Sequence, residues 1–174
     1  AIDPALAALD AVRQGKIQDS KVLTVIGANG RAMGNYRVSL GTSFAHILSE
    51  LDVKLGPRDK LVAGGPMRGF AQYSANGAVD AGVEALVVIR EENIIEWTQE
   101  PCINCGRCLD ACPIDLQVHL IALYAEFGFF ERTDELDVEQ CIDCGLCASV
   151  CTARRPLLQL IRLSKKENGS GGAP

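Results

Sequence analysis

All eight cysteines of this 174-residue chain lie in two short runs in its C-terminal half. The first run, "CINCGRCLDACP", spans residues 102–113, and the second, "CIDCGLCASVC", spans residues 141–151. In each run three cysteines recur at every third residue, and a fourth follows four residues after the last of them. Because so many thiols stand so close together, this part of the chain must fold around their chemistry.

Disulfides, zinc ions and iron–sulfur clusters all use cysteine sulfur, and the spacing helps to distinguish them. A disulfide framework is typical of small secreted chains, whereas this chain shows no secretory signal and has 48% hydrophobic residues to build a core. Zinc sites usually combine two CxxC pairs around one ion. The spacing CxxCxxCxxxCP is instead typical of bacterial two-cluster ferredoxins. The sequence therefore favours two [4Fe–4S] clusters, with structural zinc or one incomplete cluster as alternatives.

The fourth cysteine of each run is expected to serve the cluster of the other run. In two-cluster ferredoxins this residue ligates the second cluster rather than its own. The predicted ligands of the first cluster are Cys102, Cys105, Cys108 and Cys151. Those of the second cluster are Cys141, Cys144, Cys147 and Cys112. Crossed ligands bring two clusters close together, and this arrangement favours a relay of electrons over chemistry on a substrate.

Residues between the cysteines also carry predictions. Gly106 and Gly145 each follow the second cysteine of a run, where they are expected to adopt backbone conformations that a side chain would obstruct. Asp110, Asp115 and Asp143 lie beside cysteines, where carboxylates either tune a cluster potential or, more commonly, are exposed loop residues.

Charge and histidine content argue against other functions. The net charge of −5, without a long basic stripe, excludes a typical nucleic-acid-binding module. A basic group near the C-terminus is predicted to be a solvated helix face; its members are Arg154, Arg155, Arg162, Lys165 and Lys166. The two histidines, His46 and His119, lie on separate predicted helices, so neither is assigned a role.

The N-terminal half alternates between helical and strand patterns. Leu6, Leu9 and Val12 predict a leading helix that ends at Gly15. Two β-branched runs in 21–40 predict a hairpin, and a helix follows in which Ser43 or Thr42 is the cap and the apolar face holds Phe44, Ile47, Leu48 and Leu51. Short strands are expected in "DKLVAGGPMRGF" and "VEALVVIRE". The order β, β, α, β, β predicts a small β-grasp domain, so the chain is expected to be of the α+β class.

The C-terminal half reads as helical. Between the runs, Leu116, Leu120, Leu123, Tyr124 and Phe127 recur at helical spacing and predict a connecting helix, followed by a charged turn. The expected divisions are a leading helix and linker at 1–20, a β-grasp domain at 21–91, a two-cluster domain at 92–165 and a flexible tail at 166–174. No stretch reaches the roughly 20 apolar residues of a membrane span.

Four segments together resemble one known family. They are "GNYRVSLGTSFAHIL", "AGGPMRGF" and the two cysteine runs. They are similar to the C subunit of the Rnf ferredoxin:NAD oxidoreductase complex, over its β-grasp (SLBB, soluble-ligand-binding) domain and its helical two-cluster ferredoxin domain. One departure is that Thr152 follows Cys151 where the first run has Pro113.

The resemblance implies a relay subunit in a complex that couples electron transfer to ion movement across a membrane. It implies a peripheral position on the cytoplasmic side of the bacterial inner membrane, with other subunits and donor and acceptor proteins as partners. FMN and NADH are expected on an upstream domain or another chain, so this chain alone is not expected to oxidise NADH. We expect it to be part of a longer subunit or a shortened relative.

Two alternatives remain open at the level of sequence. The cobalamin reductase of the propanediol-utilisation microcompartment, an iron–sulfur flavoprotein, is similar across the same two domains. A scaffold without redox function is the other, in which metal ions only staple the helices and the β-grasp domain binds a partner. The cluster potentials, the direction of electron flow, the coupling ion and any ligand of the β-grasp domain are not readable from the sequence.

Overall fold

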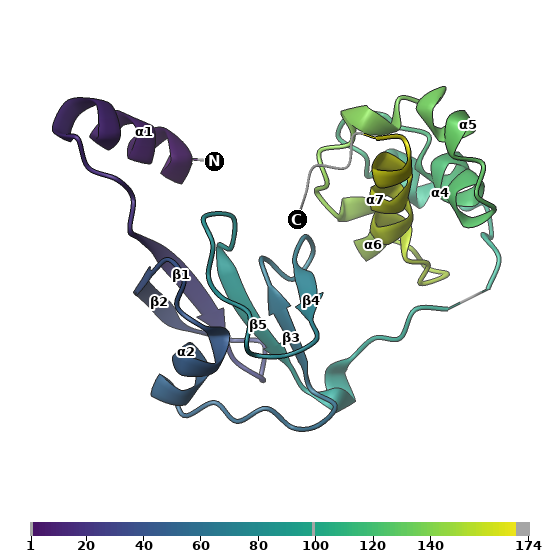
Figure 1. Cartoon of the computed structure of the whole chain (residues 1–174). Helices are drawn as coiled ribbons and strands as arrows, with labels where there is room; N and C mark the ends of the chain where they lie inside the picture. The colour runs from purple at the N-terminus through teal and green to yellow at the C-terminus, as the bar shows by residue number, and fades with distance from the viewer. Residues whose placement is uncertain (1, 99, 170–174) are drawn as a thin grey trace. The chain divides into compact units, whose positions relative to one another are not determined.

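The computed structural model describes residues 2–98 and 100–169 (Figure 1). The chain divides into two compact units, Ala1–Ile94 and Ile95–Pro174. We call them the sheet unit and the cysteine unit. The first contains a five-stranded sheet, and the second is built from helices and turns. The mixed α+β class predicted from the sequence is therefore confirmed.

The strands of the sheet unit pair in the order β2-β1-β5-β3-β4. Strands β1 (Ser20–Ile26) and β2 (Ala32–Ser39) form the predicted antiparallel hairpin. Strand β5 (Ala85–Ile89) runs parallel to β1 and antiparallel to β3 (Lys60–Ala63), so it lies in the middle of the sheet. Its burial agrees with the continuous apolar run in the sequence.

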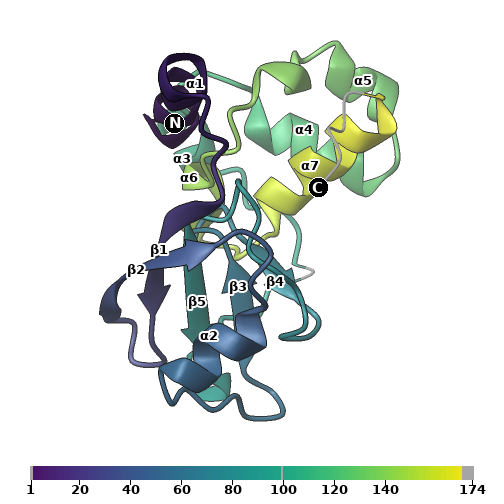
Figure 2. The same cartoon turned by 60° about the vertical axis from the view of Figure 1, so that its left-hand side comes forward.

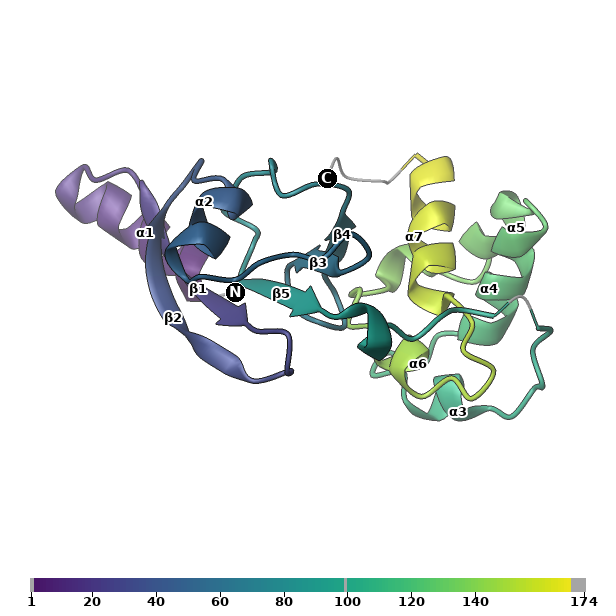
Figure 3. The same ribbon diagram turned by 90° about the horizontal axis from the view of Figure 1, so that it is seen from below.

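Helix α2 (Phe44–Glu50) covers one face of this sheet (Figures 2 and 3). The Ser43 side chain caps the helix as predicted, because its Oγ accepts a hydrogen bond from the His46 N–H at 3.2 Å. The helix buries Phe44, Ile47 and Leu48. They form a core with alternate strand residues, among which are Leu23, Val25, Leu86 and Val88. The predicted helix face is thus correct, except that Leu51 lies at the end of the helix and is half-buried.

Two features of the sheet unit differ from the sequence prediction. A further strand, β4 (Phe70–Gln72), follows the Gly-rich turn and pairs antiparallel with β3, and it is too short to show a periodic pattern. Helix α1 (Ile2–Gln14) is present, but its stripe of Leu6, Leu9 and Val12 is exposed. A short 3-10 helix, η1 (Glu91–Asn93), follows β5.

The cysteine unit consists of short helices. Each run leads into a one-turn helix, α3 (Arg107–Asp110) or α6 (Leu146–Ser149), and these two helices contact each other. The longer helices α4 (Val118–Glu126) and α7 (Leu157–Glu167) pack together beside α5 (Phe130–Asp134), as Figure 3 shows. A 3-10 turn, η2 (Val138–Gln140), precedes the second run.

The predicted connecting helix is present as α4, but the charged turn expected after it contains a second helix, α5. Gly128, with φ of 75°, ends the helical stretch shortly after α4, and α5 starts at Phe130. The buried face of α4 consists of Val118, Ile121, Ala122 and Ala125. Of the residues whose spacing predicted the helix, Leu116 is buried, whereas Leu123 and Phe127 are exposed. The buried face is therefore not the stripe of large apolar residues.

Helix α7 extends into the predicted tail, to Glu167, and residues 170–174 of that tail lie outside the described residues. Among residues 2–98 and 100–169, no helix is both long and apolar enough to cross a bilayer.

Candidate metal centre

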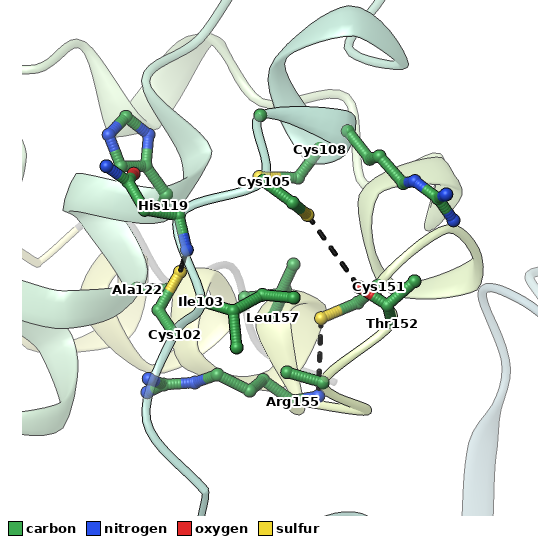
Figure 4. A pocket seen from close by; sticks show the side chains of 14 residues that line it. Cys102, Ile103, Cys105, Cys108, His119, Ala122, Cys151, Thr152, Arg155 and Leu157 are labelled. Carbon is green, nitrogen blue, oxygen red and sulfur yellow. Dashed lines mark hydrogen bonds between the residues drawn. The ribbon is translucent and has the colours of Figure 1, made fainter.

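The eight cysteines line two separate cavities of the cysteine unit, four at each. Figure 4 shows the first, which is lined by Cys102, Cys105, Cys108 and Cys151. The second is lined by Cys112, Cys141, Cys144 and Cys147. We call them the first site and the second site. Each combines three cysteines of one run with the fourth cysteine of the other.

All eight cysteines are free thiols in this structure. Within the described ranges, no group of three or more His, Cys, Asp or Glu side chains is gathered tightly enough to hold one metal ion. The thiols of each site thus surround a space instead of converging on one point. The ligand assignments made from the sequence stay predictions. The grouping of the thiols at two cavities is consistent with them.

The two runs adopt the same backbone at matching positions. Each has left-handed residues at the same three places: Asn104 and Asp143 have φ of 54°, Gly106 and Gly145 have 75° and 79°, and Asp115 and Arg154 have 54° and 49°. The prediction for the two glycines is confirmed, because this conformation is costly for residues with a Cβ. With this shared backbone, the first three thiols of each run line one cavity and the fourth lines the other.

Backbone N–H groups donate to cysteine sulfur equally in the two sites. The first cysteine of each run accepts a bond from the N–H two residues later, and the fourth accepts one from the N–H four residues later. The four N···S distances are 3.4 Å, from Asn104 to Cys102, Asp143 to Cys141, Leu116 to Cys112 and Arg155 to Cys151. A thiolate is the stronger acceptor, so these bonds favour deprotonated sulfur.

The thiols differ in acidity because their surroundings differ. Burial raises the pKa of Cys147 to about 12, and it also raises the pKa of Cys108 and Cys141. At the exposed Cys105, a hydrogen bond from the Arg107 backbone N–H, followed by one with the Thr152 hydroxyl, lowers the pKa. Since metal binding needs thiolates, loading of either site releases protons to solvent.

Three of the five basic residues near the C-terminus are not part of the solvated face that the sequence predicted, whereas Arg154 and Lys166 are exposed as expected. Arg155 is only 4% exposed and forms an ion pair with Glu126. Arg162 Nε and Lys165 Nζ lie 2.9 Å and 3.1 Å from the Asp143 carboxylate, beside the second run. Burial of this half-buried carboxylate raises its pKa, but hydrogen bonds from Arg162 and Lys165 outweigh that effect and lower the pKa. The prediction was wrong for these residues because Glu126 approaches Arg155, and Asp143 approaches Arg162 and Lys165, only in the folded unit.

His119 was assigned no role from the sequence, yet it belongs to the wall of the first site. It lies on α4 and lines the cavity together with Arg155 and Thr152. Its Nδ1 is buried and has no hydrogen-bond partner in the part of the chain that the structure describes. The only sequence signal was its place seven residues after Cys112, on the helix that follows the first run.

Comparison with known proteins identifies the cysteine unit. Residues 101–154 match the model of the 4Fe-4S dicluster domain. This match covers both cysteine runs and the segment between them. It is consistent with the spacing argument, which points to the same type of domain.

Curated relatives extend the similarity to most of the chain. The C subunit of the proton-translocating ferredoxin:NAD(+) oxidoreductase complex of Clostridium ljungdahlii is 32% identical over 168 residues, which are 96% of this chain and 37% of the relative. The C subunit of the ion-translocating oxidoreductase complex of Methanosarcina acetivorans is 35% identical over 164 residues, 94% of this chain and 36% of the relative. The C subunit of the Na(+)-translocating ferredoxin:NAD(+) oxidoreductase complex of Acetobacterium woodii is 31% identical over 147 residues, which are 84% of this chain and 33% of the relative.

The chain spans about a third of the length of these relatives. The shared part includes the sheet unit as well as the cysteine runs, because the alignments cover 84% to 96% of the chain. Over that part, the chain is homologous to the C subunits of Rnf-type ion-translocating oxidoreductase complexes.

Proposed function

We propose that this chain is an electron-transfer relay with one [4Fe–4S] cluster in each site. The ligands of the first cluster are Cys102, Cys105, Cys108 and Cys151, and those of the second are Cys112, Cys141, Cys144 and Cys147. The observation that carries the proposal is that four thiols, three from one run and one from the other, line each cavity. This is the division that crossed ligation requires.

The residues of both sites fit this cofactor chemically. Four cysteines are the ligand set of a [4Fe–4S] cluster. Left-handed Gly106 and Gly145 lie between the second and third cysteines of each run, and these cysteines line one cavity. The four N–H donors at 3.4 Å stabilise negative charge on sulfur. When bound, such clusters accept and pass on single electrons.

Contacts inside the cysteine unit support transfer between the two sites. Cys108 lies on α3 and Cys147 on α6, and these helices contact each other. Both thiols belong to one buried cluster of side chains with Leu116, Val118 and Ile161. The packing of this cluster holds the two cavities at a fixed separation. A fixed, short separation is what an electron relay needs.

For the sheet unit we propose the β-grasp fold and a docking role. The hairpin, the helix that covers one face of the sheet and a fifth strand parallel to the first support this assignment. We keep the proposed divisions at 1–20, 21–91, 92–165 and 166–174. The boundary between 91 and 92 lies close to the one between the compact units 1–94 and 95–174. The SLBB-like identity rests on the family resemblance.

The wider role follows from the family. The relatives' names describe subunits of ferredoxin:NAD(+) oxidoreductase complexes that translocate protons or sodium ions. We propose that this chain relays electrons in such a complex, bound peripherally at the cytoplasmic side of the membrane, with other subunits and donor and acceptor proteins as partners. FMN and NADH are then bound by an upstream domain or another chain.

Electron paramagnetic resonance of anaerobically prepared, dithionite-reduced protein tests the relay. Two clusters in neighbouring cavities predict two paramagnetic centres whose signals are broadened by their magnetic interaction. If protein that is fully loaded with metal gives no iron signal, the relay is refuted. The metal-stapled scaffold is then the better account of the cysteines.

A further inference from the structure

The walls of the two sites can be compared residue by residue because their backbones match. Thr152 follows Cys151 as Pro113 follows Cys112. Helix α4 contributes to the wall of the first site, and α7 contributes to that of the second. At three matching positions the first site has a polar residue where the second has an apolar one. The pairs are Thr152 and Pro113, Arg155 and Leu116, and His119 and Leu158.

Arg155 adds a positive charge to the wall of the first site, as Arg107 also does. The Arg155 side chain is 5% exposed and lines the cavity, whereas the side chain of its partner Glu126 is 41% exposed and lies outside the lining. The arginine of this pair is therefore part of the wall, and the glutamate is not. Leu116, the matching residue of the second site, is buried and neutral. A bound group that becomes more negative on reduction is favoured in the reduced form by a nearby buried cation.

Hydrogen-bond donors also favour the first site. The Thr152 Oγ1 lies 3.7 Å from the Cys105 Sγ, and a hydroxyl beside a thiolate donates to it (Figure 4). Pro113, at the matching position, carries no donor. The buried His119 Nδ1 has no partner among the described residues, and the matching residue of the second site is the aliphatic Leu158. Donors to cluster sulfur raise the reduction potential.

Solvent exposure acts in the same direction. Cys102 and Cys105 are exposed, whereas Cys141 and Cys144 are half-buried. Water stabilises the more negative reduced form at the first site. Near the second site, Arg162 and Lys165 bind the Asp143 carboxylate, which offsets part of their charge, and Lys165 Nζ also donates to the Cys141 carbonyl oxygen. None of these three side chains belongs to the lining of that cavity.

We propose that the first site has the higher reduction potential of the two, and that the buried Arg155 contributes to the difference. The inference rests on the proposed function, because it requires a cluster in each site. The first electron supplied by a one-electron reductant then resides at the first site. Transfer from a reduced second site to an oxidised first site moves one electron, with no proton and no bond made or broken.

A redox titration of the loaded protein with dithionite, followed by electron paramagnetic resonance, tests this difference. The wild type is expected to show two couples. Arg155→Leu gives the first site the residue type of the second, so it should lower the higher-potential couple and leave the other nearly unchanged. Arg155→Lys retains the charge and should restore most of the potential. Glu126→Gln keeps an acceptor for Arg155 but removes the negative charge, so it should raise the same couple.

The opposite signs expected for Arg155→Leu and Glu126→Gln separate an effect of charge from a structural one. Arg58→Leu is the matched control, because it removes one arginine from an exposed ion pair with Glu91 in the sheet unit and should move neither couple. If Arg155→Leu does not load iron, Glu126→Gln decides the matter alone. A lower-potential couple that responds to these variants, or two couples that do not, would overturn the inference and leave the relay intact. A wild type with no reducible couple would overturn both.

Discussion

The sheet unit and the cysteine unit build their cores from different materials. In the sheet unit, aliphatic and aromatic side chains of the strands pack against Phe44, Ile47 and Leu48 of α2. In the cysteine unit, Cys108 and Cys147 are themselves core residues, and three further cysteines pack against that core. The helices that carry these two thiols are single turns of four residues. Isolated helices of this length are unstable in water.

This difference teaches where the stability of each unit comes from. Burial of apolar surface in the sheet unit supplies a favourable term that needs no cofactor. The cysteine unit depends in addition on what the thiols hold, because metal binding energy becomes folding energy in small metal-binding domains. We therefore expect the two units to respond differently to loss of metal, loss of one ligand, loss of core volume and acid.

Removal of iron has the largest expected effect. Treatment with a chelator and an oxidant should abolish amide protection in α3 and α6 and weaken it in α4 and α7, because the turns around the thiols lose their common ligand. Protection in β1 and β5 should stay. Hydrogen exchange measured by mass spectrometry follows both units in one sample. Persistent protection of α3 and α6 in metal-free protein would contradict the difference between the units.

The substitution Cys112→Ala should damage the second site, although Cys112 belongs to the first run. About half of the iron should be lost, since one of two four-iron clusters loses a ligand. Alkylation of the thiols, mapped by mass spectrometry, should then modify Cys141, Cys144 and Cys147. The matched control, Cys108→Ala, should instead open the thiols that share its cavity: Cys102, Cys105 and Cys151. Modification of the first run in both variants would show local ligation.

Loss of core volume should affect the sheet unit alone. Leu86 is fully buried in β5, so Leu86→Ala should lower the free energy of unfolding of that unit by about 2–5 kcal/mol. Val22→Ala in β1 is the control at an exposed position, with an expected change within about 0.5 kcal/mol. Denaturant-dependent hydrogen exchange gives both values. The cluster signals should be the same in the two variants, and a change in them for Leu86→Ala would link the units.

The smallest expected effect is on the acid stability of the sheet unit. A hydrogen bond from the Gly56 N–H, together with Arg90 and against some burial, lowers the pKa of Asp59 below its ordinary value of 3.8. The stabilisation from this carboxylate is therefore fully present above that value and is lost as the pH falls through the lowered pKa. Asp59→Asn should reduce the stability of the sheet unit at neutral pH and flatten its acid dependence below about pH 5. An unchanged acid profile in exchange experiments would refute this role.

The fold could be predicted where a local pattern and the tertiary environment agree. The hairpin, the Ser43 cap and the apolar run of β5 are each encoded within a few residues. Strand β4 could not be found, because three residues show no period and its pairing depends on a turn. In the connecting segment, the spacing of large apolar residues located the helix but not its buried face, because Leu123 and Phe127 are exposed.

The site was readable to the extent that it consists of cysteines. Spacing alone grouped the thiols in the same two sets that line the two cavities. The wall of the first site was not readable, because the contributions of Arg155 and His119 to it depend on how their segments pack in the folded unit. A buried arginine among basic neighbours looks like a surface residue until its burial is measured.

The number of irons, acid-labile sulfides and zinc ions per chain after anaerobic preparation tests the central claim most directly. Two four-iron clusters predict about eight irons and about eight sulfides, with little zinc. About two zinc ions per chain without sulfide would contradict the account, and the cysteines would then be structural zinc ligands.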